Sequence, residues 1–147
     1  MSDDEKVAKD LVETLKDGER GFAAAAEKLR DSDRAEWATT LQRLAEQRAG
    51  FRREIVGMGH EYGDDVDESG SVAASLHRGW ISLKDALTGD DAGSVLGAAV
   101  TGEDHAVSEY EKAEKHDLRA GFRDVVSPQR VAVVAARDEV KALQLAD

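Results

Sequence analysis

The chain has 147 residues, of which 41% are apolar and 35% charged, and its formal net charge is -11 at pH 7. This length suffices for one hydrophobic core. The chain has no cysteine, which excludes disulfides, thiol nucleophiles and thiolate-bound zinc or iron–sulfur clusters. Its acidity would repel phosphate backbones, and no stretch reaches the roughly 18 apolar residues of a membrane span. We therefore expect neither nucleic acid nor membrane as a partner.

The first residues of the sequence are acidic. They read Met1-Ser2-Asp3-Asp4-Glu5, whereas a secretory signal starts with basic residues and continues with an apolar run. We therefore expect a cytoplasmic protein.

The first part of the chain predicts two antiparallel helices, over residues 3–30 and 34–60. Each begins with a capping box, formed by Ser2 with Glu5 and by Asp33 with Glu36. Each then carries apolar residues at alternating steps of three and four. The stripes include Val12, Leu15, Glu19, Phe22 and Leu29 in the first helix and Trp37, Leu41, Leu44, Arg48, Phe51 and Ile55 in the second. Because the turn between them is short, the helices must run antiparallel to bury both stripes.

The second part predicts one short helix and two long ones, and no segment has the pattern of a strand. The short helix covers 71–87 and includes Trp80 in its apolar stripe. The long helices cover 91–116 and 119–145, and Pro128 either starts the last helix or kinks it. The stripes include Leu96, Val100, Glu103, Val107 and Tyr110 in the first long helix and Val126, Arg130, Val133, Arg137 and Val140 in the second.

Three dipeptides recur in the same order in the two halves of the chain, which indicates an antiparallel helix pair used twice. The first copies are Gly18-Glu19, Glu27-Lys28 and Gln47-Arg48, and the second copies are Gly102-Glu103, Glu111-Lys112 and Gln129-Arg130.

A charged residue interrupts the apolar stripe of every long helix. The four residues are Glu19, Arg48, Glu103 and Arg130, one acid and one base from each half. Glu and Arg are almost never fully buried unless they are paired. We therefore predict a buried network of these four side chains near the middle of the bundle. The alternative is that they lie at the edges of their stripes, with their charged ends in water.

Several stretches of the chain resemble a bacterial family of four-helix-bundle proteins, the domain of unknown function 2383 (DUF2383). They are Asp17-Gly18-Glu19 with Gly21-Phe22, 47–51, 69–72, Leu76-His77-Arg78-Gly79-Trp80, 83–89 and Gly102-Glu103-Asp104. The resemblance implies a ferritin-like bundle with 71–87 inside the crossover, and it implies no known activity. Members of the family that the chain resembles often have a His in the last helix, at the position where this chain has Arg137.

A metal site is the alternative use of the buried acids. A ferritin-like di-iron centre needs a Glu from each of two helices and a Glu-x-x-His from each of the other two. Glu19 and Glu103 stand where the first two belong, and His105 and Glu109 are the further candidates. No Glu stands three residues before any His, because those positions hold Gly57, Ala74, Gly102 and Ala113. We therefore expect no cofactor, with iron as the alternative.

A calcium loop is a weaker possibility. Asp65, Asp67, Ser69 and Gly70 match the first half of an EF-hand loop, but Leu76 stands where the bidentate Glu is needed. We expect a solvated acidic loop there.

Together these patterns predict one all-α domain over 1–147, a ferritin-like up-down four-helix bundle with a short crossover helix between its second and third long helices. We expect no enzymatic activity, because no phosphate-binding loop or serine triad is present. The resemblance suggests an interaction or stress-associated protein that acts through a homo-oligomer or a protein partner. The alternative is a degraded iron-binding protein centred on Glu19 and Glu103.

Overall fold

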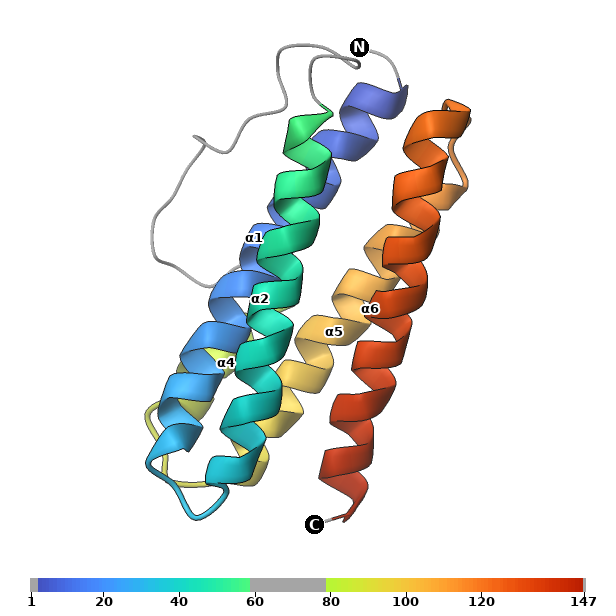
Figure 1. Ribbon diagram of the computed structural model, residues 1–147. Coiled ribbons are helices and arrows are strands. Elements are labelled where there is room, and N and C mark those ends of the chain that lie inside the picture. The colour runs from blue at the N-terminus through green and yellow to red at the C-terminus, as the bar shows by residue number, and fades with distance from the viewer. Residues whose placement is uncertain (1–2, 59–78, 147) are drawn as a thin grey trace.

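The computed structural model describes residues 3–58 and 79–146, and the described residues form helices with no strand among them. The helices are α1 (Asp3–Arg30), α2 (Ala35–Gly57), α4 (Ile81–Ala86), α5 (Ala92–Glu114) and α6 (Ala120–Ala146) (Figure 1). This architecture confirms the predicted all-α helical bundle.

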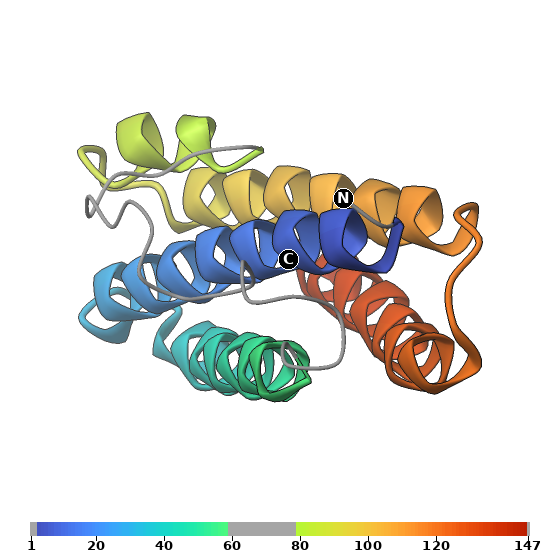
Figure 2. The same cartoon turned by 90° about the horizontal axis from the view of Figure 1, so that it is seen from above.

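The four long helices form two antiparallel pairs. Figure 1 shows α1 and α2 running in opposite directions, α5 running in the direction of α2, and α6 returning in the direction of α1. The most extensive packing joins α1 to α2, followed by α5 to α6 and α1 to α5. Figure 2 shows α4 on the outer side of the α1–α5 layer, with α2 and α6 spread apart on the opposite side. The last helix is therefore held mainly by α5 and lies at the edge of the bundle.

The last helix contains Pro128 in its interior. It begins at Ala120 and continues to Ala146, so Pro128 does not start it. Proline removes the N–H that would bond to the carbonyl of Asp124, four residues earlier. Asp124 and Pro128 are both exposed, so water can satisfy that carbonyl. The solvent-facing position explains how the helix tolerates this residue.

The predicted helix over 71–87 differs from the observed chain path at its tryptophan. Residues 71–78 lie outside the described part. Gly79 has a φ of 77°, a left-handed conformation that an α-helix excludes, and Trp80 is the N-cap residue of α4 with a φ of -107°. The helical prediction is therefore wrong at Gly79 and Trp80, because burial of the indole determines the backbone there.

Trp80 is inserted between α1 and α5 at a point where each helix has a glycine. A Cβ atom on Gly21 or on Gly102 would lie 2.2 Å from the nearest indole atom. The indole is 1% exposed and packs edge-on against Phe22, with 4.9 Å between ring centroids. The two glycines are therefore required by the close approach of this ring.

The core of the bundle consists of two apolar clusters. One contains Phe22, Leu41, Trp80, Leu96 and Val140 among others, and the second contains Leu11, Ile55, Tyr110, Phe122 and Val133 among others. Buried polar or charged side chains lie between the two clusters along α1, α2 and α5, and on α6 one lies within the second cluster, between Val126 and Val133. These residues are Lys16 and Asp17 on α1, Arg48 on α2, Glu103 on α5 and Gln129 on α6. We call them the polar layer.

We expect Gly102→Ala to destabilise the protein by about 1–3 kcal/mol, because the added methyl group overpacks the buried indole of Trp80. Gly50→Ala is the matched control. Its Cβ would have no neighbour within 4 Å, and removing a glycine from a helix interior stabilises by about 0.5–1 kcal/mol. Urea unfolding of both variants measures the difference. Equal stability of the two variants would show that Trp80 does not fill the space beside Gly102.

Candidate functional site

The polar layer contains a fully buried ion pair between α2 and α5. Arg48 Nη1 donates to Glu103 Oε1 over 2.5 Å, and Arg48 Nη2 donates to Glu103 Oε2 over 2.7 Å. The side chains are 1% and 0% exposed. This bidentate geometry is the strong form of a charge-assisted hydrogen bond. Both carboxylate oxygens of Glu103 are therefore engaged by one guanidinium.

Residues of α1 form one wall of the space around the guanidinium. The central carbon of the guanidinium lies 5.2 Å from the ring centroid of Phe22, a cation–π distance. A Cβ on Gly18 would lie 3.5 Å from Arg48 Nη1, so a side chain larger than alanine would enter the space of the guanidinium. A third N–H donor, Arg48 Nε, bonds to Gln47 Oε1 over 3.1 Å. Arg48 is thus both paired and packed.

Burial dominates the electrostatics of Glu103. Removal from water raises the pKa of Glu103 above its ordinary value, and the attraction of Arg48 offsets only part of this effect. Desolvation can exceed the Coulombic gain of a buried pair. The desolvation of Glu103 is therefore only partly offset by its pairing with Arg48.

A second polar chain within the bundle joins α5, α6 and α2. Tyr110 donates its hydroxyl proton to Gln129 Oε1 over 2.6 Å, and Gln129 Nε2 donates to Glu54 Oε1 over 2.7 Å. Burial raises the pKa of the Tyr110 hydroxyl. This keeps the group protonated and able to donate. Gln129 lies outside the predicted apolar stripe of the last helix, which includes the neighbouring Arg130 instead.

The predicted network of four charged residues does not form, and this is a correction. Glu19 pairs instead with Arg52, at 3.0 Å from Nε, and Arg130 pairs with Glu114, at 2.5 Å from Nε to Oε2. The side chains of Glu19 and Arg130 are 35% and 37% exposed. Both lie one position beside a buried residue of their helix, so their charged ends reach partners at the rim. Only Arg48 and Glu103 meet in the interior.

The candidate metal ligands are not gathered into a site. Glu103 is bound by Arg48, and Glu109 pairs with Lys112 over 3.0 Å. His105 packs against Gly79, whose Cβ would lie 2.5 Å from the Cβ of His105. Within residues 3–58 and 79–146, no group of three or more His, Asp or Glu side chains could hold a metal ion. The calcium-loop candidates at 65–76 lie outside the described residues.

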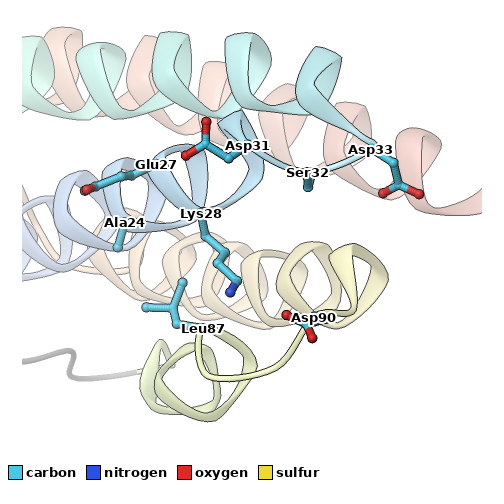
Figure 3. A pocket seen from close by; sticks show the side chains of 8 residues that line it. All are labelled: Ala24, Glu27, Lys28, Asp31, Ser32, Asp33, Leu87 and Asp90. Carbon is cyan, nitrogen blue, oxygen red and sulfur yellow. The ribbon is translucent and has the colours of Figure 1, made fainter.

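An open cleft of about 720 Å³ lies at the end of α1, beside the α4–α5 turn (Figure 3). It is lined by Ala24, Glu27, Lys28, Asp31, Ser32, Asp33, Leu87 and Asp90. Figure 3 shows Lys28 extending toward the turn that carries Leu87 and Asp90. The Ser32 hydroxyl donates to the Leu29 carbonyl over 2.8 Å, and no histidine is among the described residues that line the cleft. The described part of the lining therefore contains no serine activated by a histidine.

Comparison with known families gives a match over most of the chain. A family model described as a domain of unknown function (DUF2383) matches residues 5–116. The match includes both partners of the buried ion pair and ends before α6. A comparison with curated proteins finds no match. Among the helices that the structure describes, none combines the length and the apolar character needed to cross a membrane.

Truncating either partner of the buried pair should destabilise the protein strongly. We expect Arg48→Met or Glu103→Leu alone to cost about 3–5 kcal/mol, because each leaves an uncompensated buried charge. The double variant should equal or exceed the native chain in stability, by up to about 4 kcal/mol, because it removes both desolvation costs. Urea unfolding of the four chains gives the coupling energy.

A surface pair provides the control for that cycle. Arg43 and Glu139 pair over 2.6 Å with side chains 55% and 42% exposed. Arg43→Ala should cost less than about 1 kcal/mol. If Arg48→Met cost as little as this control, the interior pair would be excluded.

The pKa of Glu103 also predicts a pH dependence of stability. Because the folded-state pKa lies above the ordinary value of 4.5, the folded chain binds this proton more tightly than the unfolded chain does. The contribution of Glu103 to stability should therefore fall as pH rises from about 4.5 through the folded-state pKa. The measurement is the unfolding free energy of the native chain minus that of Glu103→Gln at several pH values. A difference that grows with pH would instead mean a lowered pKa.

Proposed function

The chain belongs to the DUF2383 family, a family of unknown function, and on that premise we propose that it is a non-enzymatic, ferritin-like bundle that acts by association with another protein chain. In this proposal the Arg48–Glu103 pair stands in the place of a di-iron centre. The protein partner is a second copy of the chain or another protein. The proposal includes a cytoplasmic location and, by analogy with the bacterial family, a stress-associated role.

The observation that carries this proposal is the bidentate pairing of Glu103. Iron in a ferritin-like bundle is bridged by carboxylates and completed by imidazoles. Both oxygens of Glu103 already accept hydrogen bonds from Arg48, at 2.5 and 2.7 Å. The guanidinium supplies the positive charge that a metal would supply, and it fills the space next to the carboxylate. The residues present therefore do not fit an iron pair.

The histidines support the same conclusion. The residues three positions before His105 and His116 are Gly102 and Ala113, so neither histidine belongs to a Glu-x-x-His pair. His116 Nδ1 lies 3.7 Å from Asp3 Oδ2 at the end of the bundle. No imidazole is positioned to complete a carboxylate-bridged centre among the described residues.

The surface supports an association role. Large apolar side chains are exposed at Ile81, Val131 and Leu145, in an acidic chain in which 35% of the residues are charged. Single apolar side chains on a surface are common in monomers, so these three residues permit association without requiring it. Association requires no catalytic group, and it is compatible with the charged pair closed inside the bundle.

Iron loading tests this proposal. The purified chain is incubated with ferrous iron in air, desalted, and analysed for iron by elemental analysis. We expect only background iron, equal in the native chain and in Glu103→Gln. Stoichiometric iron that Glu103→Gln abolishes would contradict the proposal and favour the iron-binding alternative centred on Glu19 and Glu103.

A further inference from the structure

Helix α6 is the least buried of the four long helices. Only 6 of its 27 residues are buried, against 15 of 28 in α1, 8 of 23 in α2 and 10 of 23 in α5. Its buried side chains are also small, since Phe122 is the one aromatic residue beside three valines, an alanine and a glutamine. It lies at the edge of the bundle, spread apart from α2 (Figure 2). Because packing is stabilised mainly by apolar burial, α6 is the long helix that the bundle holds most weakly.

The contacts that fasten α1, α2 and α5 to one another do not involve α6. Trp80 lies between α1 and α5, and Arg48 pairs with Glu103 between α2 and α5. The most extensive packing of the bundle joins α1 to α2. All of these contacts would remain if α6 moved away.

One buried polar side chain fastens α6 to two other helices. Gln129 accepts a hydrogen bond from the Tyr110 hydroxyl on α5 over 2.6 Å, and its Nε2 donates to Glu54 on α2 over 2.7 Å. The same Nε2 lies 3.4 Å from the carbonyl oxygen of Phe51, also on α2. Gln129 is 2% exposed, so water does not compete for these bonds. Removing this side chain would leave polar groups on both neighbouring helices without it.

Ion pairs at the rim add only weakly to this fastening. Arg130 pairs with Glu114 on α5, and Glu139 pairs with Arg43 on α2. The four side chains are between 22% and 55% exposed. Pairs this exposed contribute little to stability, because water and salt screen them.

The sequence of α6 does not favour a helix in isolation. It contains six valines, whose branched side chains lower helix propensity, and Pro128 removes one of its internal hydrogen bonds. Isolated helices are marginal in water even when their sequences favour a helix. A detached α6 would therefore lose its helical hydrogen bonds, and its backbone amides would exchange hydrogen with water.

We infer that α6 is a detachable helix, which leaves the bundle as one unit while α1, α2 and α5 stay packed, and that Gln129 is the side chain that holds it closed. Detachment uncovers the Tyr110 hydroxyl and the side of α5 against which α6 packs. The closed form predominates, and the open form is a minor state of the native protein. The inference concerns a single chain and does not depend on the proposed function.

Hydrogen exchange of the native chain, followed by NMR at low urea concentrations, tests the inference. We expect the amides of residues 129–136 in α6 to share one opening free energy, lower than that of Leu11 and Leu15 in α1. Their exchange should also depend less on urea, because detachment exposes less surface than complete unfolding. Equal opening free energies and equal urea dependence in α1 and α6 would overturn the inference, since α6 would then open only with the whole bundle.

Gly102→Ala separates detachment from complete unfolding. The added methyl group strains the contact of Trp80 with α5, which is kept when α6 detaches. This variant should therefore speed amide exchange in α1 by about 5- to 150-fold and leave exchange in α6 unchanged. Equal acceleration in both helices would overturn the inference.

Gln129→Ala acts on the closed form itself. The truncation removes the partner of Tyr110 and Glu54, so detachment and complete unfolding should both become more frequent, by the same factor of roughly ten. Gln144→Ala is the matched control, because Gln144 is an exposed glutamine of the same helix, and it should leave exchange in both helices unchanged. Exchange in α6 that stays at the native rate in Gln129→Ala would overturn the role of Gln129.

Discussion

The main constraint inside the bundle is the bidentate pairing of Arg48 with Glu103, because neither charge can be buried without the other. It lies between two apolar clusters, so every long helix changes from apolar to polar and back again along its buried face. Removing the two charges from water is costly, and the raised pKa of Glu103 indicates that the attraction does not fully repay this cost. We infer that the pair adds specificity of register rather than stability. A shift of α2 along α5 by one helical turn, about 5.4 Å, would leave both charges buried and unpaired.

The pair is connected to the outside of the bundle through aromatic packing. Trp80 packs on Phe22, and the guanidinium of Arg48 lies over the same Phe22 ring, at 5.2 Å. Gly18, Gly21 and Gly102 allow these groups to approach the helix backbones. Trp80, the helices α1 and α5 on either side of it, and the ion pair are thus one packed unit. Within this unit both carboxylate oxygens of Glu103 accept hydrogen bonds from Arg48.

Much of this fold could be predicted from apolar periodicity, because helices of more than 20 residues repeat the signal many times. The short segment around Trp80 was misassigned for the opposite reason. Its spacing fits a helix, while the position of the indole depends on glycines far away in the sequence. Arg48 and Glu103 were identified as charges inside apolar stripes. Spacing alone does not choose between adjacent positions. The predicted stripe of α6 therefore contains Arg130, whereas the buried residue is Gln129, one position earlier.

The most direct test of the central interaction is an NMR measurement of the Arg48 guanidinium. A buried bidentate pair holds the Nη protons in fixed hydrogen bonds, so we expect separate Nη–H resonances that exchange slowly with water and disappear in Glu103→Gln. The exposed Arg43, whose side chain is 55% exposed, provides the reference for a mobile guanidinium. A single averaged, rapidly exchanging Arg48 signal like that of Arg43 would show that the pair is not formed in the interior.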